Sequence, residues 1–201
     1  TDLMIPNICG DVLCNKLKHD ERTSHIPIIL LTAVHSKESE IESLKRGADD
    51  YITKPFDIEV LDQKVMNRMR LKEKIRSRFK IEMISEPTKV VTQSPDEKFM
   101  IRAMKAIEEN LSDADFDIEK FAVEVGVSRM QLYRKMNAIT GMTVKEFIRN
   151  IRIKRAKQLL EDGAMTVSEV AYNVGFKDIA YFRKCFKQQV GINPSEISKG
   201  E

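Results

Sequence analysis

A short pattern recurs in the second half of the chain, and it constrains the fold more than any other feature. Ala122-x-x-x-Gly126 returns as Ala171-x-x-x-Gly175, and a basic amphipathic segment follows each copy. A small alanine lets two helices cross at close range, and glycine adopts the left-handed conformation that a tight turn requires. The repeat therefore predicts two helix–turn–helix motifs. An ordinary all-helical repeat is the alternative that stays open.

From Pro95 onward the whole sequence has helical periodicity, with Asp or Ser at helix starts and Gly at helix stops. We expect helices over residues 96–111, 117–124, 128–138, 143–161, 166–173 and 178–189. The two motifs then occupy about 117–138 and 166–189 of an all-α domain that spans 97–201.

Charge is distributed unevenly along this domain. Residues 97–128 hold 4 basic and 8 acidic side chains, whereas residues 129–187 hold 13 basic and 5 acidic ones. A block this basic within a folded region favours a polyanionic partner, although a solvated helical surface would have the same composition. Its position favours double-stranded DNA, because the second helix of such a motif enters the major groove.

The first half alternates strands and helices. Ile26 to Leu31 is a nearly continuous apolar run, typical of a strand buried on both faces in a parallel sheet. The other expected elements are a helix over Gly10 to Lys18, a helix from Ser36 to Gly47, a strand over Asp50 to Thr53 and a long helix from Ile58 to about Lys80. This order is that of a doubly wound α/β fold, but the strands are too few for a self-sufficient sheet. We expect incomplete folding, aggregation or pairing with a second chain.

A basic helical extension and a linker join the halves over residues 67–96, and periodicity is lost over 82–96. The longest apolar run is too short to span a membrane, and three cysteines cannot build a disulfide framework. We interpret Cys9 and Cys14 as packing residues and expect a cytoplasmic protein. Because the chain begins at Thr1 within an apolar stretch, we expect it to be a piece of a longer protein.

Residues 97–197 resemble the AraC-type DNA-binding domain. The most specific stretches are Thr166 to Phe176, Tyr181 to Lys187 and Gly191 to Ser195. The helix from Val144 to Leu160 resembles the rigid connector between the two subdomains of that family. The family usually has an aromatic residue where Ile197 stands, which affects only the terminal packing.

This resemblance implies that both second helices lie in successive major grooves, about 34 Å apart. The side chains implied at the bases are Arg129, Met130, Tyr133 and Arg134 in the first motif and Ile179, Ala180, Arg183 and Lys184 in the second. Those implied at phosphates are Lys135, Lys177 and Lys187. For Met130 and Tyr133, packing is an equally open interpretation. The residues assigned to the core are Leu132, Tyr181, Phe182 and Phe186.

Residues 1–66 resemble the C-terminal part of a flavodoxin-like response-regulator receiver domain. The matching residues are Asp2 to Pro6, Gly10, Leu30 to Ala33, Gly47 to Tyr51 and Lys54 to Phe56. The resemblance implies that Asp2 is the phosphoacceptor and that Tyr51 is the switch aromatic. It further implies that the Thr32 hydroxyl and the Lys54 ammonium stabilise the added charge.

The first strands and helices of a receiver are absent from this sequence, and with them the acidic pair that binds Mg²⁺ in that family. Asp2 and the Met4 carbonyl give only part of a site for a hard cation, which needs several oxygen ligands. We therefore expect Mg²⁺ and phosphorylation in the intact receiver, and little of either in this chain.

The sequence is compatible with two functions. The first is a DNA-binding transcription regulator, a homodimer controlled by aspartyl phosphorylation from a histidine kinase acting in cis or in trans. The alternative is the output end of a hybrid sensor histidine kinase whose kinase modules lie upstream of residue 1. We expect no enzymatic activity from this chain itself, since it has no catalytic Ser/His/Asp or Cys/His set, no metal-ligand spacing and no P-loop.

Overall fold

The computed structural model describes residues 2, 4–5, 8–33, 47–85 and 94–197. The chain divides into two compact units, which are described separately below. The first comprises Thr1–Glu82, Thr88–Glu97 and Ala138–Gly141, and the second comprises Met83–Pro87, Lys98–Asn137 and Met142–Glu201. No helix in the described part of the chain is both long enough and apolar enough to cross a membrane.

The first unit contains two short pairs of strands. Strand β3 (Ile29–Thr32) pairs in parallel with β4 (Asp50–Thr53), as the apolar run predicts. Strand β1 (Met4–Ile5) pairs in antiparallel fashion with β2 (Ile8–Cys9), a hairpin that the sequence did not predict. A parallel bridge also joins Asp2 to Leu31, which places Asp2 beside the end of β3.

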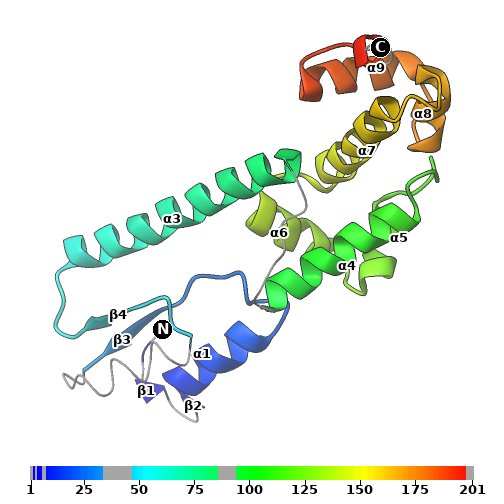
Figure 1. The fold of residues 1–201 in the computed structure, drawn as a ribbon. Helices are drawn as coiled ribbons and strands as arrows, with labels where there is room; N and C mark the ends of the chain where they lie inside the picture. Colours follow the sequence, from blue (N-terminus) through cyan, green and yellow to red (C-terminus); the bar gives the residue numbers. More distant parts are fainter. Residues whose placement is uncertain (1, 3, 6–7, 34–46, 86–93, 198–201) are drawn as a thin grey trace. The chain divides into compact units, whose positions relative to one another are not determined.

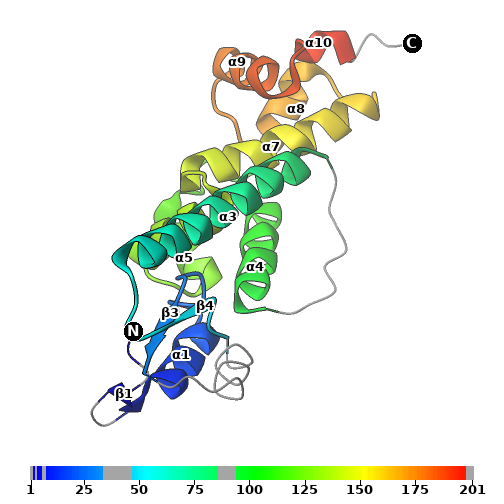
Figure 2. The same cartoon turned by 90° about the vertical axis from the view of Figure 1, so that its left-hand side faces the viewer.

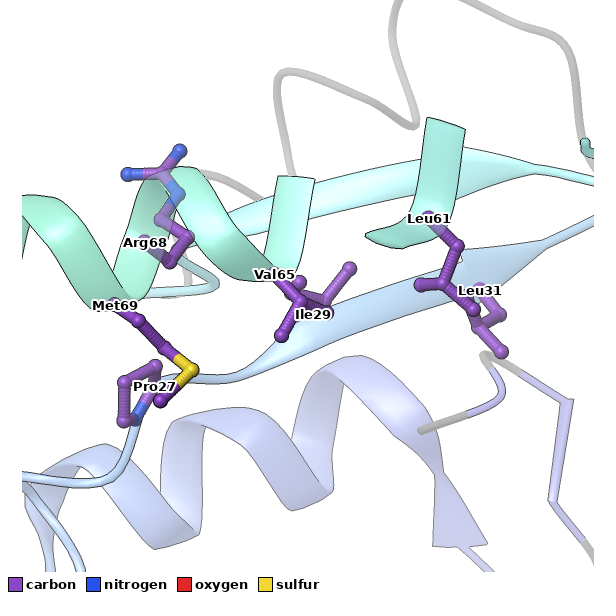
Figure 3. A pocket seen from close by; sticks show the side chains of 7 residues that line it. All are labelled: Pro27, Ile29, Leu31, Leu61, Val65, Arg68 and Met69. Carbon is purple, nitrogen blue, oxygen red and sulfur yellow. The ribbon is translucent and has the colours of Figure 1, made fainter. Parts of the chain in front are cut away.

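The two faces of β3 are buried to different extents. Leu30 is 1% exposed and packs with Cys14 of helix α1 (Gly10–His19), as expected for a packing cysteine, whereas Cys9 is exposed. On the opposite face, Ile29 and Leu31 line an open pocket of about 400 Å³ beneath α3 (Ile58–Ser85). Figure 3 shows β3 between α1 and α3, with side chains of α3 pointing towards the strand. The strand is therefore less buried on the α3 face than the sequence predicted.

Helix α3 continues past the predicted end near Lys80 and into the predicted linker. No glycine or proline interrupts the sequence from Ile58 to Ser85, whereas Pro87 disfavours helical backbone at the residue before it. The helix expected from Ser36 to Gly47 falls almost wholly outside the described residues, as does the middle of the predicted linker.

The second unit is all helical, and each predicted helix is present within about two residues of its expected ends. The helices are α4 (Pro95–Glu109), α5 (Ile118–Val125), α6 (Arg129–Thr140), α7 (Val144–Glu161), α8 (Val167–Asn173), α9 (Ile179–Val190) and α10 (Pro194–Ile197). Figure 2 shows α8, α9 and α10 on one side of α7, and α4 and α5 on the other.

Local signals explain these helix ends. Thr143 and Thr166 each form a capping box with the glutamate three residues on, so that two backbone N–H groups at each helix start are satisfied. Gly126 ends α5 with φ +76°, and Gly175 follows α8 with the same φ. The repeated glycines therefore make the same left-handed turn, and each turn leads into a second helix, α6 or α9 (Figure 1).

Candidate functional site

The residues expected at the phosphoacceptor site meet at the carboxyl ends of parallel strands. Thr32 is the last residue of β3, and Lys54 directly follows β4. The register pairs Thr32 with Thr53, and the Lys54 N–H donates to the Thr32 carbonyl oxygen at 2.6 Å. This edge of a parallel sheet is where α/β folds bind ligands.

Asp2 and Lys54, 52 residues apart in sequence, form an ion pair in which the ammonium donates to the carboxylate. Both side chains remain 40% exposed, so the pair is open to solvent on one side. Thr32 is buried at the end of β3, paired with Thr53, the residue directly before Lys54. This arrangement provides a carboxylate nucleophile with a cation beside it, the combination needed to stabilise an added phosphoryl group.

The described residues do not complete a site for a hard cation. Asp2 contributes one carboxylate, and one of its oxygens accepts from Lys54. In the described part of the chain, no group of three or more His, Cys, Asp or Glu side chains is placed to hold a metal ion. Receiver domains generally bind Mg²⁺, but these residues alone do not fit that ion.

Tyr51, the expected switch aromatic, lies half-buried on β4 against helix α3. The ammonium of Lys64 on α3 lies 5.2 Å from the centre of the Tyr51 ring and donates to the Tyr51 carbonyl oxygen at 2.9 Å. Lys64 also binds the Asp50 carboxylate at 2.8 Å, and Arg68 binds it at 3.2 Å. Tyr51 and the start of α3 are therefore directly coupled.

In the first helix–turn–helix motif, α6 presents most of the predicted DNA-contacting side chains to solvent. Arg129, Met130, Tyr133 and Arg134 are all exposed. The Arg129 guanidinium lies 5.7 Å from the centre of the Tyr133 ring. Met130 is 62% exposed, so it does not pack in the core. Leu132, on the opposite face of α6, is fully buried as predicted.

Lys135 is placed differently from the prediction. Only 3% of this residue is exposed, and its ammonium lies 5.1 Å from the centre of the Phe99 ring. Lys135 lies three residues after Leu132, on the buried side of α6, and the cation packs on an aromatic face. We therefore remove Lys135 from the set expected to contact phosphate.

In the second motif, α9 has a clearly buried face and a clearly exposed face. Phe182 and Phe186 are fully buried, as predicted, whereas Ala180, Arg183, Lys184 and Lys187 are exposed. Ile179 is half-buried and packs against the core, which leaves less of it available for a base. The prediction that Tyr181 belongs to the core is wrong, because it is 51% exposed, with its ring centroid 6.1 Å from that of Phe176.

Two acidic residues that were not among the predicted site residues form ion pairs with side chains predicted to contact DNA. Glu119 of α5 forms an ion pair with Arg129 at 2.5 Å, and Asp115 forms one with Lys177. Both carboxylates come from the acidic segment that precedes the basic block. The abrupt change of charge between these segments was the signal that could have indicated such pairs.

Comparison with known protein families agrees with both resemblances. Residues 1–66 match the response regulator receiver domain, and residues 121–200 match a helix-turn-helix domain. The chain joins part of a receiver domain to an AraC-type helix-turn-helix domain.

Three proteins are similar to all or part of this chain. Histidine kinase P4 of Formosa agariphila is 38% identical over 196 residues, which cover 98% of this chain and 14% of that protein. The transcriptional activator RhaR of Cronobacter sakazakii is 32% identical over 85 residues, which cover 42% of this chain and 30% of that protein. The C-terminal domain of AraT, a response regulator from Geobacillus stearothermophilus, is 26% identical with a TM-score of 0.47, covering 51% of this chain and 85% of that domain. The chain thus spans a minor part of the curated relatives it matches.

Proposed function

We propose that this chain is the output part of a two-component system, a sequence-specific DNA-binding transcription regulator controlled by aspartyl phosphorylation. The observation that carries the proposal is the exposed surface of the two second helices. Each helix buries its apolar face in the core and presents cations to solvent, Arg129 and Arg134 on α6 and Arg183, Lys184 and Lys187 on α9.

These side chains have separate roles in the proposed complex with double-stranded DNA. Arg134 and Arg183 pair with guanine edges, because a guanidinium matches the two acceptors of that base in the major groove. Lys177 and Lys187 contact phosphates, which positions the protein and makes the affinity salt-dependent. To bind DNA, Arg129 and Lys177 exchange their carboxylate partners for the nucleic acid.

Control by phosphorylation begins at Asp2 in the intact receiver. The Asp2 carboxylate takes a phosphoryl group from the phosphohistidine of a histidine kinase. Lys54 and Thr32 stabilise the negative charge of the added phosphoryl group. Phosphorylation shifts an existing conformational equilibrium at Tyr51 and Thr32. Helix α3, which Lys64 connects to Tyr51, transmits this change to the DNA-binding domain through dimerisation. The site of action is the cytoplasm, where the DNA lies.

A selection experiment tests the DNA-binding part. The 201-residue chain is incubated with a randomised duplex pool at two salt concentrations, and the retained sequences are read. We expect a two-part site with half-elements about one turn, or 34 Å, apart and weaker binding at higher salt. Salt-sensitive binding without sequence preference would indicate a generic basic surface, and no binding would indicate a protein partner for the helical repeat.

Phosphorylation is tested with a small phosphodonor and intact-mass measurement. We expect one added phosphoryl group on a chain extended to a complete receiver, little on the present chain and none on either after Asp2→Asn. Efficient labelling of the Asp2→Asn variant would contradict the assignment of the phosphoacceptor.

A second candidate is that the native protein is a hybrid histidine kinase with this segment as its output end. The match to histidine kinase P4 over 98% of this chain favours this possibility. An antibody against the present segment discriminates the two, because the hybrid kinase would be a far longer native protein with its phosphodonor histidine on the same chain.

A further inference from the structure

The turn of the second helix–turn–helix motif lies against the loop that precedes the first. A Cβ atom added to Gly175 would stand 2.5 Å from the Leu111 carbonyl oxygen and 2.8 Å from Cζ of Arg152. Leu111 lies between α4 and α5, and Gly175 lies between α8 and α9. Two segments 64 residues apart are thus in backbone contact, with one arginine beside them.

Arg152, on the connector helix α7, bridges these two segments through its guanidinium group. Nη1 donates to the Gly175 carbonyl oxygen at 2.9 Å, and Nη2 donates to the Asp113 carbonyl oxygen at 2.6 Å. The side chain is half-buried, and its Nε is buried without a hydrogen-bond partner in the described part of the chain. A guanidinium removed from water in this way is costly unless its remaining hydrogen bonds are well made.

A second connection lies beside the first. Lys177, two residues after Gly175, forms an ion pair with Asp115, two residues after Asp113. The loop before α5 therefore contacts the turn before α9 directly at two points, and Arg152, from the helix that joins the two motifs, bridges the same two segments.

We infer that Arg152 is a positioning residue that fixes the separation of the two DNA-contacting helices, and through it the spacing allowed between the two halves of the DNA site. The inference rests on the proposed DNA-binding function. A rigid joint accepts one spacing, because one added base pair moves a half-element by about 3.4 Å and rotates it by about 35°. This role requires the planar guanidinium group, since a lysine ammonium is a point charge that does not reproduce the fixed geometry of its hydrogen-bond donors.

The test compares the wild-type chain with Arg152→Lys on three duplexes carrying the selected site, the site lengthened by one base pair, and the site shortened by one. For the wild type we expect about a tenfold loss of affinity on each altered duplex, and for Arg152→Lys a loss under about threefold. The matched control is Arg155→Lys, because Arg155 on the same helix is exposed and donates to Gln158 of α7 at 2.9 Å. It should keep the wild-type spacing profile.

A merely structural role would lower the unfolding temperature of Arg152→Lys without changing its relative affinity for the three duplexes. Equal spacing penalties in the wild type and Arg152→Lys would therefore overturn the inference. Failure of the wild type to bind any two-part site would instead overturn the proposed function, and it is visible without any variant.

A distance measurement decides the matter if Arg152→Lys does not fold. Spin labels at Val123→Cys on α5 and Tyr172→Cys on α8 report the separation of the motifs in DNA-free protein, with exposed Cys9 replaced by Ser. Both labelled positions are exposed, whereas Cys14 and Cys185 are buried. We expect one narrow distance distribution in the otherwise wild-type protein, which needs no Arg152 variant. A broad distribution in the wild type would overturn the inference by itself.

Discussion

Gly126 and Gly175 have the same backbone conformation but different surroundings. Both have φ +76°, yet a Cβ at Gly126 meets no atom within 4 Å, whereas one at Gly175 collides with the Leu111 carbonyl and Arg152. We expect Gly126→Ala to cost about 1 kcal/mol, the strain of left-handed backbone with a side chain. Gly175→Ala should cost about 3 kcal/mol or more, because backbone must also move. Urea unfolding of both variants measures the difference, and equal losses would contradict the close approach.

Arg183 and Lys187 are both exposed on α9, which makes them a matched pair for separating base contacts from phosphate contacts. Arg183→Ala should weaken binding to the selected site by about 1–3 kcal/mol and relax the preference at one base pair. Lys187→Ala should weaken binding to all sequences alike and reduce the salt slope by about 1. Titrations on selected and scrambled duplexes at several salt concentrations measure both effects. If Arg183→Ala left affinity and preference unchanged, our placement of α9 in the groove would be wrong.

At the scale of elements, Asp50 joins β4 to α3. Burial by itself would raise the pKa of Asp50, but hydrogen bonds from Lys64, the Tyr51 N–H and Arg68 outweigh it, so the pKa lies below its ordinary value of 3.8. A carboxyl whose pKa is lowered by folding stabilises the fold above its unfolded pKa, and this contribution is lost as the pH falls through the lower folded value.

Asp50→Asn should therefore destabilise the packing of α3 on β4 by about 1 kcal/mol at neutral pH. The difference from the wild type should disappear as the pH falls below the folded pKa of Asp50. Hydrogen-exchange protection of the amides in β4 and in the start of α3, followed from pH 7 downward, measures this. A difference that does not change with pH would show that the ion pairs with Lys64 and Arg68 contribute nothing.

At the scale of the whole molecule, each unit contains a hydrophobic cluster of its own among the described residues. Leu30 packs with residues of α1 and the strands, whereas Phe182 packs with residues of α7, α8 and α9. Leu30→Ala should destabilise the first unit by about 2–5 kcal/mol and leave the DNA sequence preference unchanged. Phe182→Ala should destabilise the second unit by about 3–5 kcal/mol and weaken DNA binding. Hydrogen exchange resolved by segment checks both, and loss of protection across both units in either variant would contradict separate cores.

Features encoded by neighbouring residues were predictable from the sequence. The helices of the second unit follow from 3.6-residue periodicity with Asp, Ser and Gly at their ends, and the repeat alone indicated the two turns at Gly126 and Gly175. Strand β3 follows from an apolar run. These signals lie within a few residues of the structure that they specify, so no knowledge of distant contacts was needed. The shared site of Asp2, Thr32 and Lys54 joins residues far apart in sequence, and only the resemblance to receiver domains implied it.

The tertiary structure decided what distant segments do to each other. It buries Lys135 against Phe99 and exposes Tyr181, although both belong to helices whose bounds were predicted. It also brings Arg152 to the backbone carbonyl groups of Asp113 and Gly175, and no local sequence pattern predicts these contacts. Periodicity tells which face of a helix is apolar, but not which loop or ring lies opposite it. The burial of a cation and the separation of two motifs depend on such partners, because the free energy of each comes from contacts between residues far apart in sequence.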